Sequence, residues 1–514
     1  MAGNKKNKIE YRPAGYSALI KLYGLDVIPN WHNSYISSGG TRRINTRGNE
    51  TEEVFPSKYW PGDLPCNHLE FAIKYDGISL AILSAIFEKI NIMEITDYVR
   101  SRNTGKYARR LWFLFEFLAG KKLPLKDLEQ GNYINLLEPE KYYTVSPNIQ
   151  VRRQRINNNL LGNNNFCPTI RRTDAICRFE ESDLHNLCKK VLSGYTPEMI
   201  KRASGYLYNK ETRSSFEIEK VNPSSTKVER FVSLLQLAGS QDFCKKERLF
   251  EVQNIIVDER FKNTGYRQNQ NYIGQTISIN RERIYYVCPK PEDLHDLMDG
   301  LIKSHELMSK SDLPVVIHAA AISYGFVFLH PFEDGNGRIH RFLIHNILAI
   351  KGFSPSGVIF PVSAVMLKNP ADYDASLEAF SKPLMPLVEY SIDDNGHMTV
   401  YNETAKWYRF IDFTTQSEML FSFIEKTINE ELTNELDFLV NYDNTKNAIQ
   451  EIVDMPDRLV DLFIRFCLQN NGRLSQKKFE SHFNFLTKQE VSLLERAVRL
   501  NFKNPDQAIQ EQAY

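Results

Sequence analysis

The sequence has little that would support a disulfide framework, a zinc site or a membrane span. Its seven cysteines are scattered along 514 residues without a Cys-x-x-Cys pair, which is typical of reduced thiols. Its most apolar stretches, residues 78–87 and 111–118, are too short to cross a bilayer. The first ten residues contain no apolar segment of the kind found in a signal peptide. We therefore expect a cytoplasmic protein with no membrane partner.

The chain also lacks an excess of charge of either sign. Its formal net charge is +1 with 25% charged residues, so composition gives no general argument for a nucleic acid or a membrane surface as partner. Hydrophobic residues make up 42% of the chain, which indicates a globular protein rather than a disordered one. A chain of 514 residues is long enough for roughly two to four domains.

One short segment, His330-Pro-Phe-Glu-Asp-Gly-Asn-Gly-Arg-Ile-His-Arg341, concentrates the residues that carry chemistry. Its turn, Gly335-Asn336-Gly337, precedes a helical pattern over residues 337–351. Glycine adopts positive φ without strain and lets backbone N–H groups converge on one point. That point lies at a helix N-terminus, where unpaired N–H groups and the helix dipole favour an anion. The turn is therefore predicted to bind phosphate.

Four side chains around this turn would complete a site for nucleotide chemistry. His330 opens the loop and could take a proton from an incoming hydroxyl. Asp334 offers an oxygen ligand suited to Mg²⁺. Arg338 and Arg341 are three residues apart, so they share one helical face and can both reach a polyphosphate. A base, a metal ligand, an anion cradle and a charged clamp are the parts of an NTP-dependent transfer site.

The segment resembles the signature of the Fic (Fido) family of AMP transferases, His-x-Phe-x-Asp/Glu-Gly-Asn-Gly-Arg-x-x-Arg, with every specified position filled. The resemblance implies transfer of AMP from ATP onto a Tyr, Ser or Thr hydroxyl of a target protein, release of pyrophosphate, a requirement for Mg²⁺, and self-modification. It implies these roles: His330 as general base, Asp334 as metal ligand, Phe332 as a buried support of the loop, Asn336 and Arg338 as catalytic groups, and Gly335, Asn336, Gly337, Arg338 and Arg341 as phosphate ligands.

A β-hairpin is predicted upstream of the motif. Residues 264–274 followed by residues 277–289 resemble the flap of the same family, which pairs with the target segment through main-chain hydrogen bonds. Apolar residues alternate on both sides of a polar turn at residues 280–283. An ordinary hairpin would explain this pattern equally well, and its position before the motif favours the flap.

Further upstream, residues 214–220 resemble the inhibitory-helix motif of the family, Ser/Thr-x-x-x-Glu-Gly/Asn. Ser215 and Glu219 fit this motif, whereas Lys220 stands where Gly or Asn is usual. The resemblance implies that Glu219 pairs with Arg341 and occupies the place of the ATP γ-phosphate. A carboxylate and a phosphate compete for one guanidinium, so this pairing would make the chain autoinhibited.

Tyr373 begins a Tyr-x-x-x-Leu segment in a predicted helix over residues 372–380. In the family, a tyrosine at this place borders the nucleotide pocket, so Tyr373 is the candidate to stack on adenine. Packing of a helical tyrosine in the core is an equally good reading of this position.

The predicted fold is mostly α-helical: a Fic-type core with a β-hairpin flap, a helical N-terminal module and a C-terminal helical module that resembles a winged helix. Helices are expected at residues 66–90, 94–119, 183–193, 197–219, 226–238, 245–258, 291–309, 314–328 and 337–351. The expected divisions are a polar N-terminal arm (1–60), a helical module with an Asn-rich loop (61–175), the inhibitory-helix region (176–225), the catalytic core (226–385) and the C-terminal module (386–514).

The C-terminal module leaves two interpretations open. Residues 470–503 contain seven lysines and arginines against three glutamates, and the region 455–514 resembles helix-turn-helix modules, which indicates DNA as a partner. A three-helix bundle that binds protein or supports the core is favoured, because such a surplus is common on ordinary surfaces.

Three rival functions are considered beside AMP transfer. Relatives that act as kinases carry lysine at the second glycine of the loop, where this chain has Gly337. Removal of AMP from a target would use Glu219 to orient water. A DNA-binding regulator whose Fic domain senses nucleotide is the alternative of another class. The target protein, the modified residue and the oligomeric state are left open by the sequence.

Overall fold

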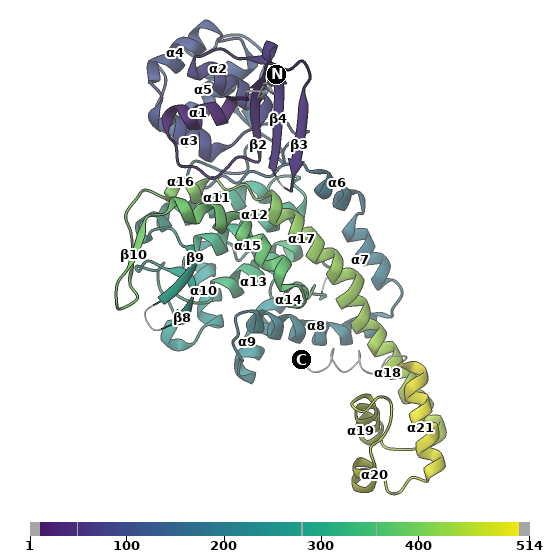
Figure 1. Cartoon of the computed structure of the whole chain (residues 1–514). Helices are drawn as coiled ribbons and strands as arrows, with labels where there is room; N and C mark the ends of the chain where they lie inside the picture. The colour runs from purple at the N-terminus through teal and green to yellow at the C-terminus, as the bar shows by residue number, and fades with distance from the viewer. Residues whose placement is uncertain (1–10, 49, 279–280, 356, 503–514) are drawn as a thin grey trace, which may run out of the picture. The chain divides into compact units, whose positions relative to one another are not determined.

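The structure is a computed structural model and describes residues 11–48, 50–278, 281–355 and 357–502. The chain divides into two compact units. Unit 1 takes the chain up to Cys177, Phe243–Ile344 and Asp374–Leu420, and unit 2 takes Arg178–Asp242, His345–Tyr373 and the chain from Phe421 onward. Most of the described residues are helical (Figure 1). Within these ranges, no helix has both the length and the apolar character needed to span a bilayer.

Unit 1 begins with a four-stranded sheet and a helix where a polar arm was expected. The strands have the order β1-β2-β4-β3, and β2 and β4 are parallel (Figure 1). Alternating residues of β2 and β4 are buried although many of them are polar, which is why composition alone suggested an arm. The elements are β1 (Arg12–Ala14), α1 (Gly15–Tyr23), β2 (His32–Ser37), β3 (Arg43–Arg47), β4 (Glu50–Pro56) and η1 (Ser57–Tyr59).

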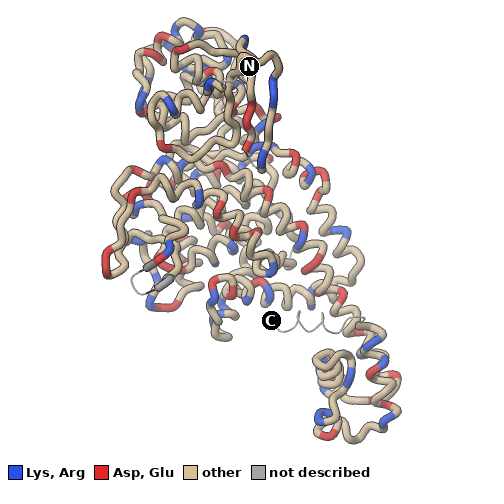
Figure 2. Tube along the Cα trace, in the orientation of Figure 1, with Lys and Arg blue, Asp and Glu red and all other residues tan. Residues whose placement is uncertain are grey.

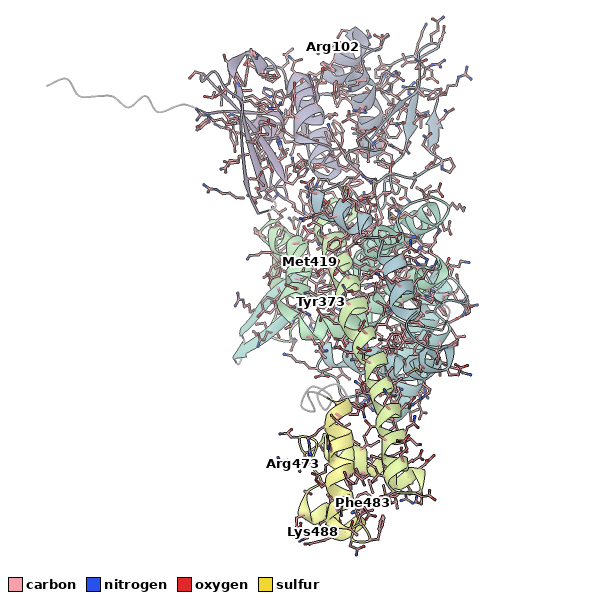
Figure 3. All side chains as sticks on the ribbon, turned by 90° about the vertical axis from the view of Figure 1, so that its right-hand side faces the viewer. Arg102, Tyr373, Met419, Arg473, Phe483 and Lys488 are labelled. Carbon is pink, nitrogen blue, oxygen red and sulfur yellow. The ribbon has the colours of Figure 1, made fainter. Side chains whose placement is uncertain are left out.

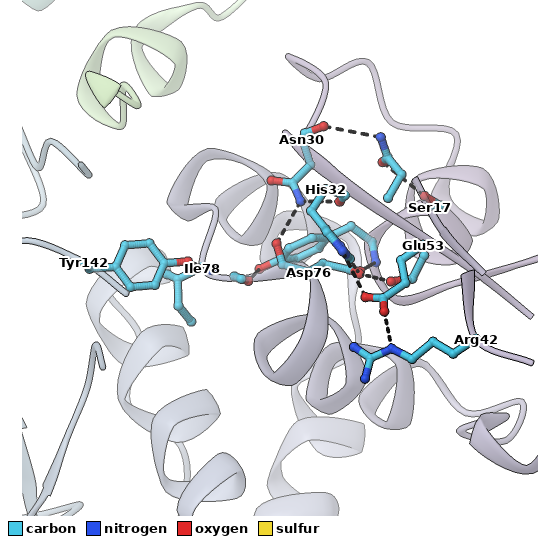
Figure 4. A network of polar contacts seen from close by, with 12 residues as sticks. Ser17, Asn30, His32, Arg42, Glu53, Asp76, Ile78 and Tyr142 are labelled. Carbon is cyan, nitrogen blue, oxygen red and sulfur yellow. Dashed lines mark hydrogen bonds and ion pairs between the residues drawn. The ribbon is translucent and has the colours of Figure 1, made fainter. Parts of the chain in front are cut away.

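A buried network of charges ties this sheet to the helices beside it. His32 on β2 lies between two carboxylates, with Nδ1 3.3 Å from Asp76 Oδ1 and Nε2 3.1 Å from Glu53 Oε2 (Figure 4). Arg42 also donates to Glu53, and Ser34 donates to Asp76. All of these side chains except Arg42 belong to buried residues. Each buried carboxylate is therefore paired, as burial of charge requires.

The predicted helices at residues 66–90 and 94–119 exist, but each is divided. The first breaks after Asp76, where Gly77 has a φ of 85°. The elements are α2 (Pro65–Phe71), η2 (Ala72–Asp76), α3 (Leu80–Lys89), α4 (Ile92–Ser101), α5 (Lys106–Ala119), β5 (Ile134–Asn135), β6 (Ile149–Val151) and β7 (Ile156–Asn158).

The basic, Asn-rich stretch that follows is used inside unit 1. Arg153 pairs with Glu116 at 2.9 Å, and Arg155 donates to the carbonyl oxygen of Gly131 at 3.0 Å. Residues 160–162, which belong to the predicted Asn-rich loop, are buried. The next residue of note, Phe166, is fully buried. The stretch is therefore part of the core rather than a linker.

Phe166 packs where two helices each carry a glycine. A Cβ on Gly325 would lie 2.7 Å from Phe166 Cζ, and a Cβ on Gly300 would lie 2.7 Å from the Phe166 backbone nitrogen. Ser304 also donates to the Phe166 carbonyl oxygen at 2.7 Å. These close approaches require glycine. They fix the middle of the helix that leads to His330.

The remaining helices of unit 1 surround one apolar helix. Every residue of α12 from Val316 to Leu329 is buried, which is the arrangement expected of a helix that is apolar on all sides. The helices are α10 (Lys246–Ile256), η3 (Glu259–Phe261), η4 (Pro291–Asp293), α11 (Leu294–Ser309), α12 (Val315–Leu329), α13 (Asn336–Ile350), α15 (Pro370–Leu384), η5 (Met385–Leu387), α16 (Ala405–Arg409) and α17 (Thr414–Lys426). Those predicted here from helical spacing are confirmed to within a few residues at each end.

Two hairpins accompany these helices. The first pairs β8 (Tyr272–Ser278) with β9 (Arg281–Val287), and the second pairs β10 (Tyr390–Ile392) with β11 (Met398–Val400). The predicted turn at residues 280–283 is too long, because Arg283 already pairs with Gln275 inside the ladder. An exposed hairpin accepts polar residues in its strands as well as in its turn, so the polar residues 280–283 did not show where the turn lies. Residues 279 and 280 of this prediction lie outside the described residues.

Unit 2 is a set of helices joined by contacts between buried polar side chains. Glu211 of α8 lies 2.8 Å from His345 Nε2 and accepts the backbone N–H of Ser363, also at 2.8 Å. Lys210 pairs with Glu431 at 2.7 Å. The helices are α6 (Asp174–Glu181), α7 (Leu184–Leu192), α8 (Pro197–Ile218), α9 (Ser225–Gln236), α14 (Val362–Lys368), η6 (Thr427–Leu432), α18 (Thr433–Ile452), α19 (Asp457–Leu468), α20 (Gln476–His482) and α21 (Lys488–Asn501).

The end of unit 2 is a small helical bundle. Phe483 is fully buried and its ring lies 5.3 Å from that of Phe463, while Arg473 and Lys488 are exposed (Figure 3). Residues 457–502 contain three helices and, in this described stretch, no strand that would form a wing. Positive and negative residues are interspersed along this region (Figure 2). A helical bundle therefore accounts for this region, and DNA contact stays a prediction.

Candidate active site

His330 ends helix α12 in a left-handed backbone conformation, with a φ of 49°. Its N–H donates to the Phe326 carbonyl oxygen at 2.9 Å, which closes the helix. Nδ1 lies 3.1 Å from the Val327 carbonyl oxygen. A carbonyl can only accept, so Nδ1 carries the proton and the lone pair is on Nε2. The cap of the helix thereby fixes the tautomer needed for a general base.

The imidazole is neutral in this environment. The pKa of His330 is lowered to about 4, chiefly by burial and also by the nearby Arg267 cation, whereas the hydrogen bond to Val327 and the Asp334 carboxylate oppose the shift. At neutral pH, Nε2 is therefore ready to accept a proton without first losing one. The polyphosphate of a nucleotide would add negative charge beside the ring and raise this pKa toward the working range.

The loop after His330 is closed by the side chain of Asn336. Its Oδ1 accepts the Phe332 backbone N–H at 3.0 Å, and its Nδ2 donates to the Phe332 carbonyl oxygen at 2.7 Å. Asn336 is 2% exposed, so both bonds are shielded from water. The sequence predicts Asn336 as a catalytic group and a phosphate ligand, and this role stays a prediction. The structure commits the side chain to the loop, which leaves the backbone N–H for an anion.

Phe332 anchors the loop from below, as expected. It is fully buried, and its ring lies 5.4 Å from Phe250, 6.1 Å from Phe326 and 6.2 Å from Tyr266. Phe332 thus joins the loop to α10, α12 and the segment before the flap. The loop is held by packing and hydrogen bonds together, which is the support that a precisely shaped site requires.

Asp334 stands at the apex of the loop with one oxygen engaged. Its Oδ1 accepts the Gly335 N–H and an Arg338 guanidinium N–H, both at 2.7 Å. Its side chain is 43% exposed. Across the described residues, no hydrogen bond reaches Oδ2, and no group of three His, Cys, Asp or Glu residues could hold a metal alone. This fits Mg²⁺, which binds one carboxylate together with substrate phosphates.

The first turn of α13 faces the same loop. Helix α13 begins at Asn336, and its first backbone bond runs from the Ile339 N–H to the Gly335 carbonyl oxygen at 2.9 Å. Gly335 has a φ of 90° and allows the sharp entry into the helix. The N–H groups that precede Ile339 are the ones that a helix leaves for an anion. Gly337 lies in this turn and adds no Cβ that would shield it.

The two arginines of the motif lie on successive turns of α13 and are almost wholly buried. Arg338 is 3% exposed and also donates to the Ile256 carbonyl oxygen at 3.3 Å, which ties the loop to the end of α10. Arg341 is 2% exposed. Guanidinium groups held in place by protein contacts lose little freedom when they bind phosphate.

The inhibitory motif lies on unit 2, at the end of α8. Ser215 is fully buried, and Glu219 is the C-cap of the helix. Lys220 follows in the left-handed conformation, with a φ of 57°. Gly and Asn adopt this conformation at little cost, which explains physically why they are usual at this position. The pairing of Glu219 with Arg341 on unit 1 stays a prediction.

Tyr373, the candidate for adenine stacking, lies in the first turns of α15 and is 7% exposed (Figure 3). Its backbone N–H donates to the Asn369 carbonyl oxygen at 3.1 Å. This burial agrees with packing in the core, and its role toward a nucleotide stays a prediction.

Two residues that sequence reasoning passed over support the site. Phe166 holds the middle of α12 from 164 positions earlier in the chain than His330, so no local pattern could reveal it. Arg267 lies in the segment that resembles the flap and contacts the His330 backbone, where its Nε donates to the His330 carbonyl oxygen at 2.8 Å. A lone arginine near a predicted turn gave no signal of burial.

Comparison with known proteins identifies a region of the chain that contains the motif His330–Arg341. Residues 243–348 match the model of the Fic/DOC family. The chain is similar to the protein adenylyltransferase fic-1 of Caenorhabditis elegans, with 35% identity over 125 residues, which are 24% of this chain and 21% of that protein. It is also similar to the protein adenylyltransferase Fic of Drosophila virilis, with 39% identity over 98 residues, 19% of this chain and 17% of that protein. The chain thus spans about a fifth of the length of these relatives.

Among solved structures, a Fic family protein of Desulfovibrio desulfuricans is similar, with 16% identity and a TM-score of 0.36 over 64% of this chain and 87% of that one. A Fic domain containing signaling protein of Bacteroides thetaiotaomicron has 19% identity and a TM-score of 0.35 over 50% of this chain and 96% of that one. The motif His330–Arg341 falls inside the range that the family model matches. The chain therefore contains a Fic domain of the Fic/DOC family at residues 243–348.

Proposed function

We propose that this chain is a protein adenylyltransferase that moves AMP from ATP onto a Tyr, Ser or Thr hydroxyl of a target protein. The observation that carries the proposal is His330, whose Nδ1 is occupied by the Val327 carbonyl oxygen, so that a neutral Nε2 is free to act as base beside a helix N-terminus. The names of the curated relatives support the same chemistry.

In the proposed reaction, the target hydroxyl oxygen attacks the α-phosphorus of ATP. The proton of that hydroxyl passes to His330 Nε2, and the bond from the α-phosphorus to the bridging oxygen breaks. Pyrophosphate leaves with the electron pair of that bond, and AMP stays on the target oxygen. The hydrogen bond from Nδ1–H to Val327 strengthens as the ring becomes positive, which stabilises the imidazolium at the moment of transfer.

The phosphates would be held by groups that the loop already fixes. The N–H groups of the first turn of α13 would bind the α- and β-phosphates, Arg338 the β-phosphate side, and Arg341 the γ-phosphate. Asp334 would hold Mg²⁺ through its exposed oxygen, and the ion would neutralise charge on the phosphates. Because Arg338 and Asp334 pair at 2.7 Å, bound phosphate must share Arg338 with this carboxylate.

We propose further that Glu219 keeps the enzyme in a resting state by taking Arg341 from the γ-phosphate. Its position at the C-cap of α8 supports this, because a residue outside the regular helix can turn its side chain without breaking helical hydrogen bonds. The left-handed Lys220 would make this helix end less stable than Gly would, by about 1 kcal/mol, so the resting state would be easier to open.

The test is a search for an AMP adduct by mass spectrometry after the full chain is incubated with ATP and Mg²⁺. The Glu219→Gly chain should carry AMP on its own hydroxyl groups, and the Glu219→Gly/His330→Ala chain should carry none. Adducts that persist without His330 would contradict the proposed mechanism. Fewer AMP adducts in Glu219→Gly than in the wild-type chain would contradict the inhibitory role of Glu219.

A further inference from the structure

Arg267 makes four hydrogen bonds, and every acceptor is a backbone carbonyl oxygen. Its backbone N–H donates to Pro331 at 2.9 Å and its Nε to His330 at 2.8 Å. Its Nη1 donates to Asn269 at 2.7 Å and its Nη2 to Pro289 at 2.6 Å. Arg267 is 2% exposed, so these bonds are shielded from solvent.

The acceptors come from three separate places in the fold. Asn269 precedes the first flap strand, β8, and Pro289 follows the second, β9. His330 and Pro331 begin the catalytic loop. A guanidinium has five N–H donors in a rigid plane, so it can bridge three carbonyls that a lysine ammonium could not reach together. One side chain therefore joins both roots of the flap to the backbone of His330.

The charge of this guanidinium is unusual for a buried group. Within the described residues, no carboxylate forms an ion pair with Arg267; three carbonyl oxygens accept hydrogen bonds from its guanidinium, and the Glu333 carboxylate acts on it only through space. Burial accordingly lowers its pKa. A buried cation without a counter-ion is costly, so a purely structural role would be better served by a neutral group. The position does suit a cation in one respect, since the C-terminal end of α12 carries a partial negative charge.

We propose that Arg267 is a positioning residue for AMP transfer, which fixes the backbone of His330 and both flap roots in one geometry so that a hydroxyl presented along the flap meets Nε2. This inference rests on the proposed function. The remaining anchor of the flap is independent of Arg267, because the Tyr286 hydroxyl donates to the Phe328 carbonyl oxygen and the Tyr408 hydroxyl to the Val287 carbonyl oxygen at 2.5 Å.

The same charge acts on the base through space. The groups that bear on His330 are Arg267 from the flap root, Asp334 from the loop and the Val327 carbonyl from its own helix. Arg267 disfavours the imidazolium, and the other two favour it. Burial also disfavours the imidazolium and would remain, but loss of Arg267 removes the charge that acts in the same direction, so the His330 pKa should rise.

The experiment compares three variants of the full chain. Arg267→Met removes the charge and the hydrogen bonds of the side chain. Arg267→Lys keeps the charge but lacks the planar set of N–H donors that reaches all three carbonyl oxygens. Tyr286→Phe is the matched control, because it removes one bond between the flap and α12 without changing charge. The His330 pKa is measured by NMR titration of histidine-labelled protein, with His330→Gln used to assign the signal. Pyrophosphate release from ATP is measured in parallel, in the Glu219→Gly background.

We expect the His330 pKa to rise in Arg267→Met and to stay low in Arg267→Lys and Tyr286→Phe. Pyrophosphate release should fall at least about tenfold in both Arg267 variants, while KM for ATP changes little. An unchanged His330 pKa in folded Arg267→Met overturns the inference. So does full turnover in Arg267→Lys, which decides the question if Arg267→Met does not fold.

Failure of the proposed function would look different. If His330→Ala keeps full pyrophosphate release, the mechanism of AMP transfer is wrong. The NMR titration would still report whether Arg267 controls the protonation of His330. The two outcomes therefore separate the positioning role from the reaction that it serves.

Discussion

Replacing Asn336 with Ala tests whether this side chain closes the catalytic loop. The change deletes two buried hydrogen bonds, at 3.0 Å and 2.7 Å, and leaves the N–H and carbonyl of Phe332 without partners. Each unsatisfied buried group costs roughly 1–3 kcal/mol, so the loss of both partners should destabilise the closed loop by about 2–6 kcal/mol. Each 1.4 kcal/mol is a factor of ten, so the opening equilibrium should rise by roughly 30-fold to 20,000-fold.

The assay is hydrogen exchange at the Phe332 amide and its neighbours in the full chain without nucleotide. The Asn336→Ala chain should lose protection in this loop while α12 keeps its own, since its anchor at Phe166 is untouched. Asn336→Asp is the matched control, because a carboxylate can still accept the Phe332 N–H and should retain part of the protection. Unchanged exchange in Asn336→Ala would refute the closing role.

Three further predictions follow from the same contacts. His340 is fully buried, and burial lowers its pKa from 6.5 to about 3, so the folded state resists protonation and stability falls as pH drops below 6.5. Between pH 7 and pH 4.5 this group should lower the free energy of unfolding by roughly 2–3 kcal/mol. Urea titrations should show that the His340→Gln chain loses correspondingly less stability over this pH range. Lys220→Gly should raise the melting temperature slightly and reduce self-modification. Glu219→Gly should raise self-modification well above wild type. Equal self-modification in the two variants would argue against the inhibitory role of this helix end. Asp334→Asn should reduce AMP transfer at least about a hundredfold with little recovery at high Mg²⁺, and activity restored by excess Mg²⁺ would show that another group holds the ion.

Much of the site could be predicted because its information is local. The Gly335 turn, the helix that follows it and the burial of Phe332 all depend on residues within one short segment. The helices around α12 carry a 3.6-residue apolar period and α12 itself is a long apolar run, so they were found to within a few residues. The sequence did not show that the Asn336 side chain bonds to the loop backbone, because a polar side chain in a loop can serve either the backbone or a ligand; its role toward phosphate stays a prediction.

The parts that sequence reasoning missed depend on contacts between distant residues. Phe166 belongs to the stretch that was predicted as an Asn-rich loop, yet two glycines far along the chain make room for its buried side chain. The N-terminal sheet has polar residues at buried positions, where His32, Asp76 and Glu53 satisfy one another. Composition records that these residues are polar, but it does not record that they are paired.

The measurement that tests the central claim most directly uses ATP labelled at different phosphates. The full Glu219→Gly chain is incubated with Mg²⁺ and with ATP that carries the label on either the α- or the γ-phosphate, beside the same chain with His330→Ala. The account predicts protein-bound label from α-labelled ATP, none from γ-labelled ATP, and a loss of at least about a hundredfold without His330. Label from the γ-phosphate, or equal labelling with and without His330, would contradict it.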